Sequence, residues 1–236
     1  MQPTVQAYKE IQDAFDYFNK ALFSGGIPAC LITLQRSKHT YGYFSSKRFI
    51  KSDGSEAIDE IALNPSYFAV VPLVEIMQTL VHEMVHAWQF HYGKAGRRGY
   101  HNKQWAAKME AVGLMPSSTG RAGGKKTGEK MSDYPIEGGD FLSAFNQLLT
   151  DKRFLISWFD RFPAYQTAVE IQTLLSDEQL NHLEEIGIQL QKEDEAKPTR
   201  YKYRCRCGCN VWGKKGLDIT CNLCDGHFEP CQVNLL

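Results

Sequence analysis

The sequence has no hydrophobic run long enough to cross a lipid bilayer. A spanning helix needs about 18 consecutive apolar residues, and the longest run near the middle, residues 68–74, is interrupted by a proline. The first ten residues, MQPTVQAYKE, also lack the basic start and apolar stretch of a secretory signal. We therefore expect a cytoplasmic protein with no membrane partner.

Cysteine is nearly absent from most of the chain. Of the seven cysteines, only Cys30 lies outside the last 32 residues. Such clustering in a reducing compartment indicates a metal site rather than a disulfide framework.

Net charge is also absent, because 27 basic and 27 acidic residues balance. The charges are nevertheless sorted along the chain. Residues 176–196 hold seven acidic side chains and one lysine, whereas residues 197–215 hold seven basic side chains and no acidic one. We therefore expect only the C-terminal end to face nucleic acid, unless both segments are simply solvated.

The composition and the local patterns predict an α+β protein. The apolar share of 43% and the charged share of 23% are those of a globular domain. Three short extended segments are expected to form a small antiparallel sheet, at residues 29–34, 41–50 and 57–63. Helices are predicted at about residues 5–24, 72–90, 102–112, 141–150 and 177–192. Residues 117–140, rich in Gly, Ser and Lys, are predicted to be an excursion or flexible loop, and residues 193–199 a charged linker.

The helix predicted at 72–90 carries apolar residues around most of its circumference. One narrow polar stripe remains, formed by Glu75, Gln78 or Thr79, His82, Glu83, His86 and Gln89. A polar stripe on an otherwise buried helix must face a partner, a metal or a water-filled cleft.

The stripe contains two histidines separated by three residues. On a helix this spacing places His82 and His86 on one face, one turn apart, where both imidazoles can reach one zinc ion. Glu83 cannot share the metal comfortably but can reach a water bound to it, which is the position of a general base. The alternative is two partly buried histidines satisfied by neighbouring groups.

A catalytic zinc needs a third protein ligand and an open position. His91 follows His86 closely but points elsewhere on the helix. Two candidates remain: His101, before the next helix, and Glu110, inside it. We prefer His101, because a glycine-bearing loop can fold it back and the apolar residues of the following helix can fix it.

The C-terminal string YKYRCRCGCNVWGKKGLDITCNLCDGHFEP predicts a zinc ribbon. The preferred ligands of its structural zinc are Cys205, Cys207, Cys221 and Cys224, with Cys209 as the spare and Cys231 and His227 as weaker substitutes. Basic and aromatic residues around the cysteines suit contacts with a nucleic-acid backbone and bases. The candidates are Lys202, Arg204, Arg206, Trp212, Lys214 and Lys215.

Several segments together resemble the SprT family, which includes the Spartan proteases. The likeness is carried by LFSGGIP, YGYF, IALNPSYF, LVHEMVHAWQ, GYHNKQW, MEAVGLMPS and the terminal YRCRCG…CNLC. It implies a helical zincin-like domain with a small antiparallel sheet, followed by a zinc ribbon. It also implies a zinc metallopeptidase with His82, His86 and His101 as ligands and Glu83 as base. The implied domains are residues 1–116 for the peptidase core, 117–199 for an extension and 200–236 for the ribbon.

The same resemblance implies activity on proteins held at DNA, notably cleavage of DNA–protein crosslinks. The expected partners are single-stranded or damaged DNA and the proteins bound to it, and we expect a monomer associated with the nucleoid. One alternative is a non-proteolytic nucleic-acid-binding or regulatory protein whose zinc sites are structural. Another is a peptidase whose substrate is unrelated to DNA.

Overall fold

The chain forms two compact units, residues 1–191 and 192–236. The computed structural model describes residues 2–37, 40–97, 99–164, 173–190 and 200–231. The predicted linker at 193–199 lies outside the described residues. The division into domains at residues 116 and 199 stays a prediction.

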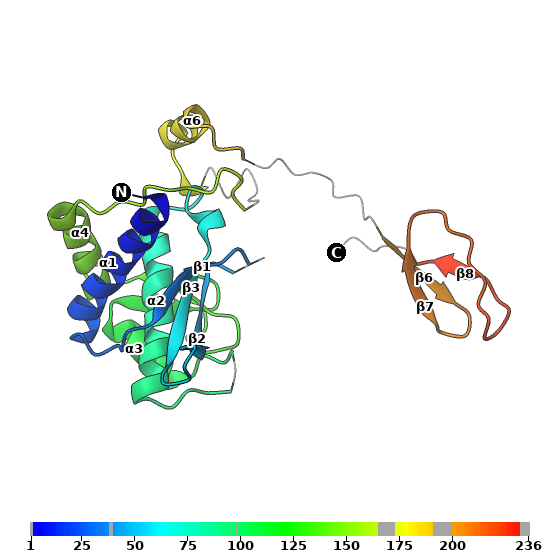
Figure 1. Cartoon of the computed structure of the whole chain (residues 1–236), viewed down its shortest axis with the longest axis horizontal. Coiled ribbons are helices and arrows are strands. Elements are labelled where there is room, and N and C mark those ends of the chain that lie inside the picture. Colours follow the sequence, from blue (N-terminus) through cyan, green and yellow to red (C-terminus); the bar gives the residue numbers. More distant parts are fainter. Residues whose placement is uncertain (1, 38–39, 98, 165–172, 191–199, 232–236) are drawn as a thin grey trace. The chain divides into compact units, whose positions relative to one another are not determined.

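Three helices and a three-stranded sheet pack together in the larger unit. Helices α1 (Pro3–Phe23), α2 (Leu73–Tyr92) and α4 (Asp140–Lys152) contact one another, and α1 and α2 also contact the sheet (Figure 1). Helix α2 begins directly after Pro72, whose ring suits the start of a helix. Helix α1 ends at Phe23, and the next residue, Ser24, has a left-handed backbone and precedes the predicted glycine pair. The helices predicted at 5–24, 72–90 and 141–150 are therefore confirmed, with each end shifted by one or two residues.

The three-stranded sheet has the order β1-β3-β2 and is mixed. Strand β2 (Gly42–Ile50) pairs antiparallel with β3 (Ala57–Leu63), but β1 (Leu31–Leu34) pairs with β3 in parallel. The prediction of a wholly antiparallel sheet was wrong. Strand β3 is the most buried of the three, so it takes the central place between β1 and β2, and β2 is left at an edge.

Helix α3 (Lys103–Ala111) follows α2 after a loop and begins at Asn102. The Asn102 side chain accepts hydrogen bonds from the backbone N–H groups of Gln104 and Trp105, which satisfies two of the free donors of the first turn. The predicted apolar face of this helix is confirmed, since Trp105, Met109 and Val112 are fully buried.

Residues 114–135, much of the predicted excursion, fold back along α3. Strands β4 (Leu114–Ser117) and β5 (Ser132–Pro135) form an antiparallel pair. A short helix η1 (Pro65–Tyr67) precedes α2, and α6 (Asp177–Glu185) carries a capping box at Ser176. Helix α6 is shorter than predicted, because Gly187 takes a positive φ of 81° just after it ends.

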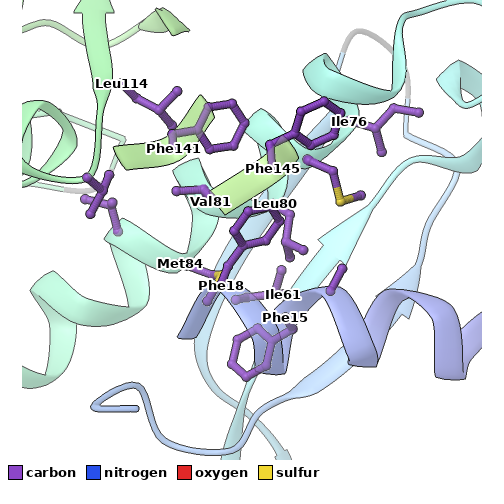
Figure 2. Packing of buried hydrophobic residues seen from close by; sticks show 14 of the residues in the cluster. Phe15, Phe18, Ile61, Ile76, Leu80, Val81, Met84, Leu114, Phe141 and Phe145 are labelled. Carbon is purple, nitrogen blue, oxygen red and sulfur yellow. The ribbon is translucent and has the colours of Figure 1, made fainter. Parts of the chain in front are cut away.

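Aromatic and aliphatic side chains from α1, α2, α4 and the sheet form one core (Figure 2). The rings of Phe18 and Phe141 lie 5.9 Å apart and stack, and Phe141 stacks on Phe145 at 6.2 Å. Leu80, Val81 and Met84 fill the space between α2 and its neighbours. This packing buries most of the apolar surface of α2, apart from its exposed last turn at Phe90 and Tyr92.

The smaller unit is a three-stranded antiparallel sheet with the order β7-β6-β8. Its strands are β6 (Tyr201–Cys205), β7 (Asn210–Gly213) and β8 (Phe228–Pro230). Among the described residues of the whole chain, no helix combines the length and the apolar character that a membrane crossing requires.

Candidate metal centres

Three imidazoles converge where α2 meets the residue preceding the N-cap of α3. His82, His86 and His101 each offer a ring nitrogen, and these atoms lie within 4.8 Å of one another. The Nε2 atoms of His86 and His101 are 3.1 Å apart. Two nitrogens that bind one tetrahedral zinc ion should be separated by roughly 3.3 Å. The donor set and its spacing therefore fit a zinc ion.

The other ring nitrogens of two of these histidines face fixed partners. His82 Nδ1 lies 2.8 Å from Asp133 Oδ2, and His101 Nδ1 lies 3.2 Å from the backbone oxygen of Gly128. Both contacts leave Nε2 free for the space that the three rings share. This is the usual arrangement when a histidine binds a metal through one nitrogen and is oriented through the other.

The indole of Trp105 packs against all three imidazoles. Its ring centroid lies 5.0 Å from that of His82, 5.5 Å from that of His86 and 4.4 Å from that of His101. Trp105 is fully buried, so the rings rest on a rigid apolar surface. Their rotamers are thereby restricted before any ion binds.

The glycine-rich segment between β4 and β5 contacts the backbone of His101, the third histidine of the cluster. Gly128 and His101 form an antiparallel bridge, in which each backbone N–H donates to the other's carbonyl oxygen, at 2.8 and 3.1 Å. This segment was predicted to be an excursion or flexible loop, and neither Gly128 nor Asp133 was predicted to take part in the site. A lone aspartate beyond a glycine-rich stretch gives no sequence signal of this role, since only the fold brings it to α2.

Glu83 lies beside His82 at the wall of an open cleft with a volume of 1050 Å³. Burial, together with the nearby charge of Asp133, raises the pKa of Glu83 to about 7, although His82 and the backbone N–H of Phe44 partly oppose this. The whole predicted polar stripe of α2 lines the same cleft, which confirms that the stripe faces an open space. The lining residues from the stripe are Glu75, Gln78, Thr79, His82, Glu83, His86 and Gln89.

Burial also sets the protonation of the histidines. It lowers the pKa of His86 to about 2 and that of His101 to about 4, helped by charge repulsion from His82. Burial alone would lower the pKa of His82 as well, but the hydrogen bond with Asp133 and the charges of Glu83 and Asp133 raise it. Near pH 7, His86 and His101 are therefore neutral and have a lone pair to offer a metal.

The structure does not bring the other predicted candidates to this site. Glu110 forms an ion pair with Lys126 at 3.0 Å and lies outside the histidine cluster. His91 points elsewhere, as predicted, and its Nε2 contacts Asp59 at 2.6 Å. Of the two sequence candidates for a third ligand, His101 is the one that meets the helix histidines.

Four cysteines form the second cluster, in the smaller unit. The sulfur atoms of Cys205, Cys207, Cys221 and Cys224 lie within 4.8 Å of one another. Cys205 Sγ is 3.2 Å from Cys224 Sγ, and Cys207 Sγ is 3.7 Å from Cys221 Sγ. Sulfurs around a tetrahedral zinc should be about 3.8 Å apart, so this cluster also fits zinc. Cys209 and Cys231, the sequence alternatives, are not members of it.

Hydrogen bonds within the cluster favour a thiolate. The Cys205 thiol and the backbone N–H of Gly226 lower the pKa of Cys224 to about 6. Arg206 donates from Nη2 to the carbonyl oxygen of Cys224 at 2.7 Å. Arg206, predicted to contact nucleic acid, thus links the two cysteine turns.

The other predicted nucleic-acid residues occupy exposed positions of the ribbon. Lys202 is paired with Trp212 across the two strands β6 and β7, and its Nζ lies 5.8 Å from the Trp212 ring centroid. Arg204 is two residues along β6 and therefore shares this face. Lys214 and Lys215 lie just beyond β7 and are exposed. Trp212 is 61% exposed, which is unusual for so large an apolar side chain.

Together, the buried histidine cluster beside an open cleft and the separate cysteine cluster define a protein with two candidate zinc sites. The chain belongs to the SprT-like family, since a sequence model of that family matches residues 11–122. The match includes all three histidines and ends before Gly128 and Asp133. Membership suggests a zinc metallopeptidase.

A protein of Salmonella typhimurium, named as an uncharacterized protein in the mucB 3' region, is similar to part of this chain. The two are 54% identical over 59 residues, which is 25% of this chain and 80% of that protein.

We predict that the two clusters bind zinc independently. Purified wild type should contain two zinc ions per chain, and both His101→Ala and Cys221→Ala should contain one, as measured by inductively coupled plasma mass spectrometry. Glu110→Gln should keep both ions, because Glu110 lies outside the histidine cluster. Two ions in His101→Ala together with one in Glu110→Gln would reverse the choice of third ligand.

A second prediction concerns the metal-free protein. Glu83 keeps its proton more tightly in the folded state, where its pKa is about 7 rather than 4.5. The tighter binding of this proton stabilises the folded state below pH 4.5, and the stabilisation is lost as the pH rises to about 7. Glu83→Gln does not titrate, so its stability advantage over wild type should grow by up to about 3 kcal/mol across this range. Urea unfolding with a chelator measures this, and a pH-independent difference would contradict it.

Proposed function

We propose that this protein is a zinc-dependent peptidase with Glu83 as its general base, and that its zinc ribbon directs it to proteins bound to DNA. The observation that carries the proposal is the convergence of three imidazoles and one buried carboxylate on the wall of an open cleft. Three protein ligands with a free side are typical of catalytic zinc, whereas structural zinc is closed by four.

His82, His86 and His101 would hold the metal, in the manner of the zincin-like peptidases that the sequence resembles. A zinc ion held there lowers the pKa of its water towards about 7 and polarises a carbonyl group. Glu83 is adjacent to His82 and lines the same cleft. A carboxylate in that position can take up a proton from the attacking water and return it to the leaving amine.

A polypeptide suits the cleft as substrate. Strand β2 lies at the edge of its sheet, and its first residues, Gly42 to Ser46, line the cleft together with the polar stripe of α2. An edge strand offers backbone N–H and C=O groups to an extended peptide, whatever the sequence of that peptide. This wall would therefore accept many substrates and would leave targeting to another part of the chain.

The ribbon is the part that would supply the targeting. Lys202, Arg204 and Trp212 lie on one face of its sheet. Basic side chains neutralise phosphates, and an exposed indole can stack on a base of a single strand. Cleavage of DNA–protein crosslinks by a monomer associated with the nucleoid is the activity that this combination favours.

The proteolytic step can be tested with one substitution. Glu83→Gln should abolish cleavage of a protein crosslinked to single-stranded DNA while the zinc content stays at the wild-type level, because an amide cannot take up the proton. Glu110→Gln is the matched control and should cleave at the wild-type rate. Cleavage by Glu83→Gln at the wild-type rate would refute the assigned base. No cleavage by wild type, with DNA still bound, would favour a non-proteolytic DNA-binding protein.

The nucleic-acid contact can be tested separately. Trp212→Ala should weaken binding of single-stranded DNA by about 1–3 kcal/mol, the usual worth of one stacked base. Lys202→Ala should lower the slope of log affinity against log salt by about one. Fluorescence anisotropy at several salt concentrations measures both quantities. Trp158→Ala is the control, because Trp158 is similarly exposed but lies in the larger unit. Equal losses of DNA affinity in Trp212→Ala and Trp158→Ala would rule out the ribbon face as the DNA-binding surface.

A further inference from the structure

We propose that Asp133 is a positioning residue, which fixes the tautomer of His82 that can bind a metal. The inference rests on the proposed metal centre, but it does not depend on whether the protein is a peptidase. Asp133 lies on β5, outside the part of the chain that the family model matches.

The contact between the two side chains is short and largely buried. His82 Nδ1 and Asp133 Oδ2 are 2.8 Å apart, and the side chains are 12% and 5% exposed. At such low exposure the Asp133 carboxylate, rather than bulk water, is the hydrogen-bond partner of Nδ1. The orientation of the His82 ring therefore depends on this carboxylate.

The backbone of Asp133 is itself fixed beside α2. Asp133 pairs with Pro116 in the β4–β5 ladder, and its carbonyl oxygen accepts a hydrogen bond from Gln78 Nε2 at 2.8 Å. Gln78 stands one helical turn before His82 on the same polar stripe. Helix α2 thus holds β5 through one side chain and receives the carboxylate through another.

The chemistry of a carboxylate explains why Asp is needed here. An ionised carboxylate only accepts hydrogen bonds, so the proton of the neutral His82 ring must reside on Nδ1 and the lone pair on Nε2. That lone pair faces the space shared with His86 and His101. An amide of the same shape could instead donate to Nδ1, and this would put the proton on Nε2 and block metal binding.

A purely structural role accounts poorly for the second oxygen of Asp133. Oδ1 is buried, and among the described residues it has no hydrogen-bond partner. A buried carboxylate oxygen without a partner costs stability, and a residue selected for stability alone would not leave one. The arrangement is the kind of local cost that functional sites carry.

The chain contains a matched control on the same helix. His91 lies near the end of α2, and its Nε2 contacts Asp59 Oδ2 at 2.6 Å. Asp59 is as buried as Asp133, but His91 is not part of the histidine cluster. Asp133→Asn and Asp59→Asn therefore remove the same kind of carboxylate from two histidines, only one of which is a candidate ligand.

The test is metal affinity in the full-length chain. Cobalt is titrated into metal-free wild type and both variants, with a competing chelator to set the free concentration. The ribbon reports through thiolate-to-cobalt charge-transfer bands, and the histidine site through its weaker visible bands. We expect Asp133→Asn to bind cobalt 10–100-fold more weakly at the histidine site, with altered visible bands and no change at the ribbon. Asp59→Asn should match wild type at both sites.

Folding is checked by thermal unfolding of the metal-free proteins, with Asp133→Ala as a second variant. Both Asp133 variants should unfold within a few degrees of wild type but should gain less from added zinc. Wild-type affinity in Asp133→Asn, or equal losses in Asp133→Asn and Asp59→Asn, would overturn the inference.

The result also separates this inference from the proposed function. If wild type binds no metal at the histidines, both the metal centre and the role of Asp133 fail. If metal binds and depends on Asp133 but no protein is cleaved, only the peptidase activity fails.

Discussion

Helix α2 is buried on almost every side, and the few polar groups that it carries must therefore find partners that the rest of the chain supplies. His82 meets Asp133, Gln78 meets the backbone of the same residue, and Gln89 donates to Asn102 Oδ1 at 2.8 Å. Leaving such groups unpaired would cost more free energy than each bond contributes. The N-cap of α3 and the segment after β4 consequently pack on the same side of α2, where they contact the polar stripe.

The two candidate zinc sites differ in what their surroundings permit. The histidine cluster has three donors, a rigid indole beneath it and an open cleft in front of it. The cysteine cluster has four donors and is tied together by Arg206 and by the strands of a small sheet with little apolar core. Small modules of this kind rely on a metal to fold, so the ribbon site suits a structural ion and the histidine site suits a reactive one.

Local patterns in the sequence predicted most of the helices, the pairing of His82 with His86, and the clustering of the C-terminal cysteines. Helices α1, α2 and α3 carry clear apolar spacing and recognisable ends, and the His82–His86 spacing has meaning on a helix alone. Long-range pairing was predicted poorly. The segment at 29–34 is rich in β-forming residues and that at 57–63 alternates weakly, and both features suit either strand direction. The sequence therefore did not indicate that β1 runs parallel to β3. Helix α6 ends at Glu185, earlier than predicted, and Gly187 just after it has a positive φ. Residue preference alone does not specify that backbone angle.

The sequence by itself determined that His82, Glu83 and His86 share one helical stripe, and that the C-terminal cysteines lie near one another. Both features follow from short spacings along the chain. Tertiary structure alone decided which partners complete the first cluster. His101 was preferred over Glu110 only after loop closure was assumed, and Gly128 and Asp133 were not anticipated at all. Their contacts with His101 and His82 span 27 and 51 positions of sequence. Contacts of that range are set by how the β4–β5 ladder packs against α2, and no local pattern encodes that packing.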